Sequence, residues 1–175
     1  MKPALSPLTI HPEPLTAAAF APFGDVICAA GDGVSANQGT ATRFNHAAAL
    51  CTLRQGAAPN LAVFRALPWT LPMPVQLLER HPHSTQMFVP MVVARYLVMV
   101  APEGPDGGPD LAGLRCFLCA PGQAINYRAG VWHHPIVALS EPSELLMLAW
   151  EDGGPEDCGE HTLEEPWLVE RAPAG

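Results

Sequence analysis

The chain has 175 residues, a formal net charge of −8 and 49% hydrophobic residues. That hydrophobic share is enough for a folded core, so disorder of the whole chain is not expected. The eight arginines are scattered singly and form no basic patch, so binding to nucleic acid or to an anionic membrane is not expected either. Twenty prolines and fifteen glycines disfavour long helices, because each proline removes a backbone donor and clashes with the preceding turn. Composition therefore favours a turn-rich β fold, in one domain spanning residues 1–175.

The predicted elements begin with a short strand at 8–10, a short helix at 17–20 capped by Thr16, and a strand at 25–28. Residues 29–39, which contain three glycines and mostly small or polar residues, are predicted to form a mobile loop. Apolar, β-prone segments then follow at the short spacing of an all-β sandwich or barrel: 41–50, 61–67, 75–80, 86–91, 96–101, 114–120, 124–128, 136–139 and 145–150. Residues 151–175 are predicted to be a C-terminal arm. The pattern indicates an antiparallel β-barrel with short helices at its margin.

Five cysteines, an odd number in apolar or mixed stretches, indicate reduced thiols in a cytoplasmic protein rather than a disulfide framework. Cys116 and Cys119 are expected to be buried strand residues and not a redox or zinc pair. The first residues lack the apolar core of a signal peptide. The most apolar stretch, 87–101, is too short to span a bilayer and is interrupted by Pro90 and Arg95.

Histidines form two pairs. His81 and His83, two residues apart at the end of a predicted strand, should point to the same face of the sheet. His133 and His134 are adjacent and should point to opposite faces, so that at most one of them joins the first pair. Imidazoles that converge from separate strands bind metals or stabilise an oxyanion, whereas a single pair is often a solvated turn. Two clusters together favour a functional site.

The segment from Gly122 to His133 resembles the second cupin motif, with Arg128 in place of its proline. The first cupin motif has a glutamate after His-x-His, but Met87 and Phe88 occupy those positions here. The nearest polar side chain is Gln86. The sequence is compatible with a divalent metal (Ni, Zn or Mn) at this site or with direct binding of a substrate by the same side chains, and it indicates no organic cofactor. The predicted ligands are His81, Gln86 and His133, with His83 as an alternative. Without a carboxylate ligand the metal would be bound more weakly but would be a stronger Lewis acid.

Four segments in the same order resemble the ureidoglycolate lyases, a cupin-like family of purine and allantoin breakdown. They are residues 14–27, Arg43-Phe44, residues 78–91, and Asn126-Tyr127 followed by residues 131–135. The resemblance implies a homodimeric, cupin-like barrel of the jelly-roll type that cleaves ureidoglycolate to glyoxylate and urea. The family often has leucine at position 83, which lowers the rank of His83 as a ligand. The chain also lacks the Asp-Arg-Gly run that the family carries near residues 151–158.

This reaction needs a base, an acid, and groups that bind the substrate carboxylate. The predicted catalytic residues are His81, His133 and Tyr127, the last as a donor to the departing urea. The predicted substrate-binding residues are Arg43, Arg80, Gln86, Trp132 and His134. Tyr127 as an ordinary buried tyrosine, and Arg80 as an ion-pair partner of Glu79, are the structural alternatives. A different metal-dependent cupin enzyme, such as an oxygenase or isomerase, and a non-catalytic small-molecule-binding cupin are the alternative functions.

Overall fold

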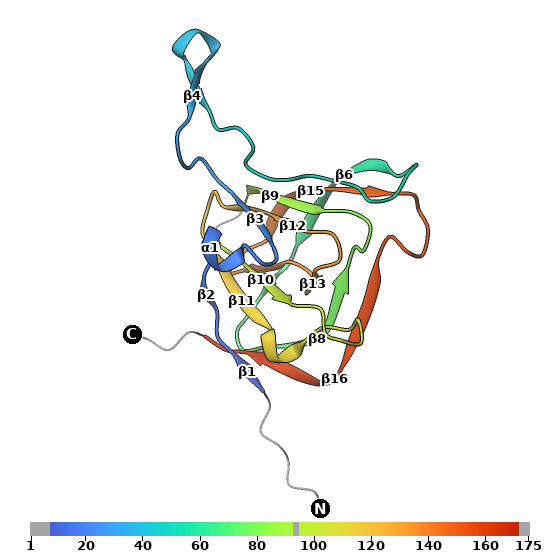
Figure 1. Ribbon diagram of the computed structural model, residues 1–175. Helices are drawn as coiled ribbons and strands as arrows, with labels where there is room; N and C mark the ends of the chain where they lie inside the picture. The colour runs from blue at the N-terminus through green and yellow to red at the C-terminus, as the bar shows by residue number, and fades with distance from the viewer. Residues whose placement is uncertain (1–7, 93–94, 172–175) are drawn as a thin grey trace, which may run out of the picture.

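Two main β-sheets make up the body of the computed structural model, which describes residues 8–92 and 95–171 (Figure 1). The last four residues of the predicted arm, 172–175, lie outside the described residues. The prediction of an all-β cupin-like fold of the jelly-roll type is confirmed. Within the described residues, the two sheets do not join into one closed, hydrogen-bonded barrel.

The larger sheet contains the first and the last strands of the described chain. In spatial order its strands are β1 (Thr9–Ile10), β16 (Gly159–Val169), β8 (Met73–Arg80), β13 (Trp132–His133), β10 (Tyr96–Ala101), β11 (Arg115–Cys119) and β2 (Glu13–Pro14), with β14 (Val137–Leu139) beside β10 and β7 (Pro68–Trp69) beside β14. Most pairs are antiparallel, as predicted. The pairs β1–β16, β2–β11 and β7–β14 are parallel.

The smaller sheet faces the larger one. In spatial order its strands are β3 (Gly24–Ile27), β12 (Ala124–Tyr127), β9 (Gln86–Val92), β15 (Ser143–Glu151) and β6 (Ala58–Ala66). The outer edge of β6 is open in the described structure. Exposed apolar side chains lie on and near this edge and at the end of β9: Leu61, Val63, Phe64, Leu67, Trp69, Met91 and Val92.

Strand β10 shows how the two hydrophobic clusters arise, because all six of its residues are buried. Val98 and Val100 belong to the cluster between the two sheets, together with aromatic residues such as Phe117. Leu97 and Met99 alternate with them and belong to a second cluster on the other face of the larger sheet. A strand buried on both faces has a continuous apolar sequence, which is why this segment was predictable without any alternation.

The helix α1 (Ala17–Phe20) forms where predicted, and the hydroxyl of Thr16 accepts a hydrogen bond from the amide of Ala19. The other helical turns are the 3-10 segments η1 (Asn37–Gly39) and η2 (Leu111–Gly113). No helix in the described segments is long and apolar enough to cross a membrane.

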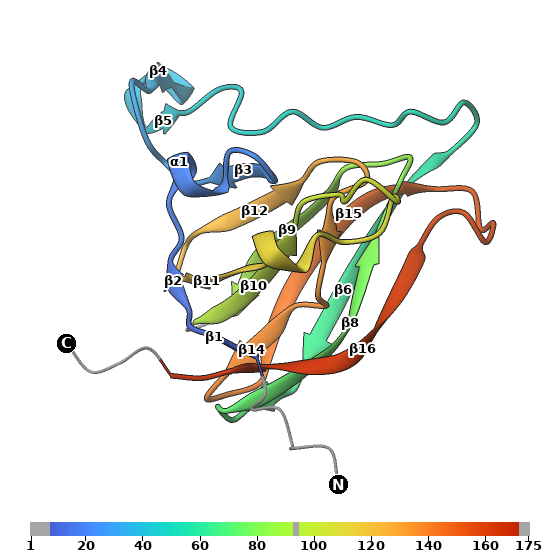
Figure 2. The same cartoon turned by 60° about the horizontal axis from the view of Figure 1, so that its bottom comes forward.

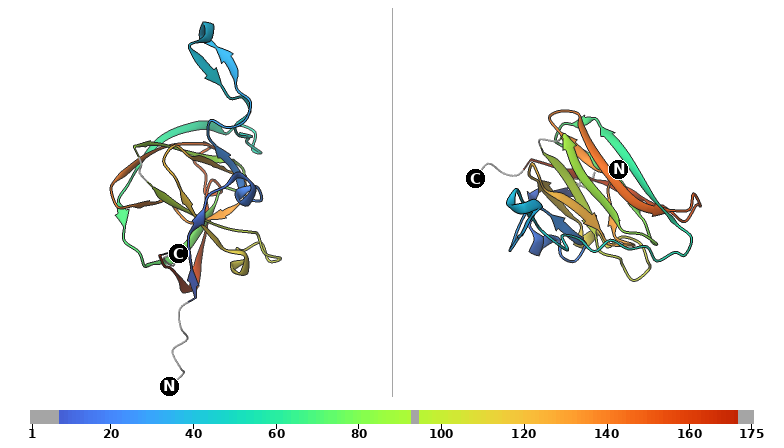
Figure 3. Two further views of the ribbon diagram at one scale, coloured as in Figure 1. Left: turned by 90° about the vertical axis from the view of Figure 1, so that its left-hand side faces the viewer. Right: turned by 90° about the horizontal axis from the view of Figure 1, so that it is seen from above.

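The prediction for residues 29–50 was wrong in two respects. In place of a loop followed by a long strand, β4 (Val34–Ala36) and β5 (Ala41–Arg43) form a hairpin around η1. This hairpin projects from the body of the molecule (Figure 1 and the left view of Figure 3). Residues 44–57, expected to be strand up to position 50, then cross the top of the molecule as an irregular segment (Figure 2).

The predicted C-terminal arm contains a strand that the sequence did not indicate. Strand β16 pairs with β8 over two stretches, separated by a change of register between Thr162 and Trp167. Its polar residues face solvent and break up the apolar pattern, which is why the Glu-rich segment resembled a tail. Strand β16 therefore places the end of the chain beside the strand that leads to His81.

Candidate functional site

His81 and His133 come together near one end of the larger sheet. His133 is in the short strand β13, and His81 directly follows the last residue of β8. Their ring centroids are 5.6 Å apart and their planes differ by 26°. The side chain of His133 is 2% exposed. The two histidines that the sequence selected from separate segments therefore share one location, in which His133 is buried and His81 is partly buried.

Backbone carbonyls fix the orientation and the tautomer of both rings. Nδ1 of His81 lies 2.8 Å from the carbonyl oxygen of Asp157, and Nδ1 of His133 lies 2.9 Å from that of Val131. Because a carbonyl oxygen can only accept, each Nδ1 must carry the proton, and each neutral ring then has a lone pair on Nε2. Both Nε2 atoms are buried and have no hydrogen-bond partner in the described structure.

Glu79 supplies a carboxylate that the sequence prediction missed. It lies directly opposite His133 in the β8–β13 pair, and its Oε1 is 3.5 Å from Nε2 of His133. The ligand atoms of Glu79, His81 and His133 all lie within 4.8 Å of one another, so these three side chains could hold a metal ion. The expected absence of a carboxylate was wrong, because the glutamate precedes the first histidine instead of following the pair.

The charge of Glu79 is stabilised by its surroundings. Burial by itself would raise the pKa of this carboxyl group, but the nearby imidazoles of His133, His81 and, more weakly, His134 lower it overall through the positive charge of their protonated forms. Burial lowers the pKa of His81, as does the proximity of His133. The site therefore combines an ionised carboxylate with an imidazole that resists protonation, which is a suitable donor set for a divalent cation.

Tyr127 reaches the same region from the smaller sheet, and Gln86 is its neighbour in that sheet. They are directly opposite each other in the β12–β9 pair, so their side chains leave the same face of that sheet. The ring of Tyr127 stacks on the ring of His133, with centroids 4.1 Å apart. The Tyr127 hydroxyl and Oε1 of Gln86 are buried without a partner in the described structure. Burial raises the pKa of Tyr127 well above its ordinary value, so its hydroxyl stays protonated.

The second member of each histidine pair lies elsewhere. Strand β8 ends at Arg80, so the alternation that would put His83 beside His81 stops before it applies. His83 instead lies 3.6 Å from the exposed carboxylate of Glu156. Nδ1 of His134 donates to the carbonyl of Pro135, and its ring is not part of the group formed by Glu79, His81 and His133.

Trp132 and Arg80 lie on the other face of the larger sheet. Trp132 precedes His133 in β13, so its side chain points the opposite way, into the second hydrophobic cluster. The guanidinium carbon of Arg80 lies 4.5 Å from the centroid of a Trp132 ring, and Nη1 donates to Glu103 at 2.8 Å. The partner of Arg80 is thus Glu103 and not the adjacent Glu79, and neither Arg80 nor Trp132 is brought to the two histidines.

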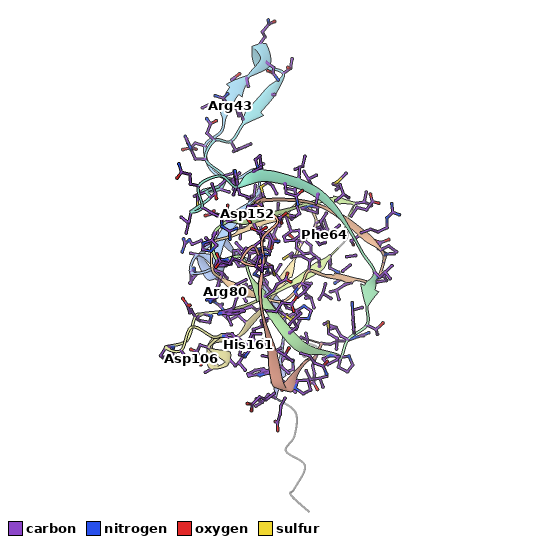
Figure 4. The ribbon with its side chains drawn as sticks, turned by 90° about the vertical axis from the view of Figure 1, so that its right-hand side faces the viewer. Arg43, Phe64, Arg80, Asp106, Asp152 and His161 are labelled. Carbon is purple, nitrogen blue, oxygen red and sulfur yellow. The ribbon has the colours of Figure 1, made fainter. Side chains whose placement is uncertain are left out.

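Arg43 is also separate from the histidines in this chain. It is the last residue of β5, it is exposed, and it lies in the projecting hairpin (Figure 4). A cavity of about 520 Å³ lies elsewhere on the body, lined in part by Trp69, Arg95 and Leu139, and its lining contains none of the predicted site residues.

The amino-acid sequence matches a known protein family. A sequence model of the ureidoglycolate lyases matches residues 7–170. The chain belongs to the ureidoglycolate lyase family. A ureidoglycolate lyase of Burkholderia cepacia is 43% identical over 93% of this chain and 90% of its own length. Ureidoglycolate lyases of Pseudomonas syringae pv. tomato and Pseudomonas aeruginosa are each 37% identical over 90% of the chain and 91–92% of their own lengths.

Membership of the ureidoglycolate lyase family gives the described geometry an enzymatic context. The matched region includes every strand that contributes to the site, from β8 to β16. The fold and the family that the sequence motifs implied are therefore confirmed. The roles of individual residues rest on the geometry alone.

Proposed function

We propose that this protein cleaves ureidoglycolate into glyoxylate and urea, and that the reaction takes place beside His81 and His133. One observation carries the assignment to this site. The unpartnered Nε2 atoms of the two histidines converge with the Glu79 carboxylate in a buried position, in a chain of the ureidoglycolate lyase family. Buried polar atoms without partners are costly, so their concentration at one place favours a ligand site.

The proton chemistry follows from the tautomers. Ureidoglycolate carries a hydroxyl and a urea nitrogen on the same carbon. An Nε2 lone pair of His81 or His133 takes the hydroxyl proton, the C–O bond becomes a carbonyl, and the C–N bond breaks. The imidazolium then returns the proton to the departing nitrogen, so no net proton is consumed. A lowered pKa suits His81 to this cycle, because the ring is neutral before the reaction and releases its proton readily.

Tyr127 and Gln86 are proposed to bind the polar groups of the substrate. Because the Tyr127 hydroxyl keeps its proton, it donates a hydrogen bond to the urea oxygen as the urea departs. The amide of Gln86 can donate to an oxygen of the substrate through its nitrogen and accept through its unpartnered Oε1. Both groups come from the smaller sheet, so the substrate would lie between the two sheets.

The donor set also fits a divalent metal such as Ni²⁺, Zn²⁺ or Mn²⁺. Glu79, His81 and His133 would hold it, so in the metal-loaded protein the two Nε2 lone pairs would ligate the ion instead of accepting the hydroxyl proton. The carbonyls of Asp157 and Val131 orient the two imidazoles as outer partners commonly do. A metal bound there supplies a Lewis acid that lowers the pKa of the substrate hydroxyl. Gln86, predicted from sequence as a ligand, lies opposite Tyr127 in the β12–β9 pair, and its Oε1 is buried without a partner in the described structure.

The assignment is tested with H81A and H133A, using a urea-release assay on both enantiomers of ureidoglycolate. H161A is the matched control, because His161 packs edge-on against Trp132, on the face of the sheet opposite His133. We expect the two site variants to lose about 10²-fold or more of kcat/KM while keeping the wild-type circular dichroism spectrum. Folded H81A and H133A proteins that release urea at the wild-type rate would rule out this site.

We further propose that the enzyme is a cytoplasmic homodimer. The five cysteines are free thiols, which suits a reducing compartment. The nine-residue edge strand β6 carries exposed Leu61 and Val63, and an identical strand can pair with it across a two-fold axis. Light scattering of V63E should show monomers where the wild type shows dimers. An unchanged dimer would place the interface on another surface.

A further inference from the structure

The ring of His81 depends on a segment far along the chain. His81 follows the end of β8, so strand pairing does not fix its side chain. Its Nδ1 donates instead to the carbonyl of Asp157, which is 76 residues away in sequence. Asp157 belongs to the connection 152–158 between β15 and β16, and Asp152, at the start of this connection, is labelled in Figure 4. The orientation of His81 is therefore controlled by the conformation of this connection.

The carboxylate of Asp157 organises that connection. It accepts hydrogen bonds from the backbone amides of Asp152, at 3.1 Å, and Gly153, at 2.7 Å. Nη1 of Arg54 donates to the same carboxylate at 2.9 Å and also forms an ion pair with Asp152. The side chains of Arg54 and Asp157 are only 16% and 15% exposed. A single carboxylate thus closes the turn on one side, while the backbone carbonyl of the same residue holds the ring of His81.

We propose that Asp157 and Arg54 are positioning residues for His81. They hold the connection 152–158 so that the Asp157 carbonyl fixes His81 as its Nδ1–H tautomer, with the Nε2 lone pair directed toward Glu79 and His133. Without this carbonyl, His81 can rotate or adopt the Nε2–H tautomer, in which the nitrogen at the site is a donor and can neither accept a proton nor ligate a metal. The effect on catalysis rests on the proposed function, whereas the effect on the tautomer does not.

Glu156 provides a matched control within the same connection. Its carboxylate is 76% exposed and lies 3.9 Å from Nη2 of Arg54, and it makes none of the hydrogen bonds to the turn amides that Asp157 makes. E156Q therefore removes one negative charge beside the same arginine and leaves the carboxylate that closes the turn. A purely electrostatic or general stabilising effect would appear in E156Q and D157A alike, but a positioning effect would appear only in D157A.

The test combines imidazole ¹⁵N NMR of metal-free protein at pH 8 with steady-state kinetics of urea release. In the wild type and E156Q we expect His81 to be unprotonated at Nε2. In D157A and R54A we expect a population protonated at Nε2, and a fall in kcat of about 10- to 100-fold with a smaller change in KM. R54K, which keeps the charge beside Asp157, should recover part of the loss.

If D157A does not fold, D157N is used as the second variant. Its side-chain amide keeps one acceptor oxygen for the turn amides, so we expect a population of the Nε2–H tautomer of His81 between those of the wild type and D157A. Folded D157A or D157N protein in which His81 keeps the wild-type tautomer would overturn the proposal, whatever its activity. A tautomer shift in a protein whose wild type releases no urea would support the positioning role, and the proposed function alone would fail.

Discussion

The rings of Tyr127 and His133 stack at 4.1 Å with their planes 15° apart, although Tyr127 belongs to the smaller sheet and His133 to the larger one. This contact joins the two sheets at the proposed site. It stacks the tyrosine ring, whose hydroxyl is buried without a partner, on the imidazole that carries an unpartnered Nε2, which is the basis for proposing that both groups act on one substrate.

Replacing Tyr127 with Phe should separate its catalytic role from a structural one. Y127F keeps the stacked ring but removes the unpartnered hydroxyl, so we expect kcat to fall on the order of 10²-fold and the free energy of unfolding to stay the same or rise. Urea release and denaturant midpoints measure the two effects.

Tyr96 is the control for Y127F. It is equally buried, but its hydroxyl donates to the carbonyl of Gln123 at 2.7 Å. Y96F should therefore lower stability by about 1–3 kcal/mol, since the carbonyl loses its partner, and should leave kcat unchanged. The Tyr127 assignment fails if Y127F is destabilised like Y96F and retains full activity.

Replacing Glu79 with Gln should weaken metal binding. E79Q removes the only carboxylate of the three-residue group while keeping the size of the side chain, so we expect the affinity for Zn²⁺ or Ni²⁺ to fall at least about 10-fold. Titration calorimetry on chelator-treated protein measures this affinity. E103Q, at the exposed partner of Arg80, should bind as the wild type does. Equal affinities of E79Q and the wild type would contradict the proposed ligand set.

Replacing Arg80 with Met should affect stability rather than turnover. The guanidinium contacts Trp132 and Glu103 on the face opposite His133, so we expect a loss of at most about 1 kcal/mol and unchanged kcat/KM. Denaturant unfolding and urea release check the two parts. A tenfold loss of kcat/KM in folded R80M protein would contradict this and support the sequence prediction that Arg80 binds the substrate.

The cysteines should differ sharply in reactivity. Burial raises the pKa of Cys116 to about 12 and raises that of Cys119 further, whereas Cys28 and Cys51 are exposed. Iodoacetamide at pH 8 should therefore label Cys28 and Cys51 in native protein and leave Cys116 and Cys119 unlabelled until denaturant is added; mass spectrometry identifies the sites. Labelling of native Cys119 would show that the core between the sheets opens.

Stability of the metal-free protein should fall as the pH is lowered from about 7 to 5. Burial lowers the pKa of His81 and of His134 in the folded protein, whereas both titrate near 6.5 when unfolded. Below that pH the unfolded chain binds protons that the folded chain excludes, so the free energy of unfolding decreases. The midpoints of urea denaturation, measured between pH 5 and 7, report this change in the free energy of unfolding. H134N, whose amide can replace the bond to Pro135, should show a weaker dependence, and a midpoint that rises toward pH 5 would contradict the assignment.

The sequence predicted the elements whose signals are local. The Thr16 cap is read from neighbouring residues, and the run 96–101 coincides with β10 because burial on both faces makes it continuously apolar. Strand β16 and the β4–β5 hairpin were not predicted from the sequence, because their residues are mostly polar or small. Their pairing depends on partners that only the tertiary structure brings close.

Within the site, the strand pattern accounts for only part of the result. Glu79 and His81 are two residues apart and come together, but His81 lies just beyond β8 and its ring is held by the carbonyl of Asp157, so the spacing alone did not reveal the group. The alternation of strand residues failed for His83, because the strand ends at Arg80. Which of His133 and His134 faces inward depends on the register of β13 against β8, which pairs His133 with Glu79 and which no local pattern encodes.

Strand β16 has a consequence for the order in which the enzyme can mature during synthesis. The connection 152–158 and β16 leave the ribosome after the other strands of the described residues, yet the carbonyl that holds His81 belongs to that connection. A nascent chain that has already paired β6, β9 and β15 still lacks the partner that orients His81. Activity should therefore be the last property that the growing polypeptide acquires, after most of its hydrophobic core has formed.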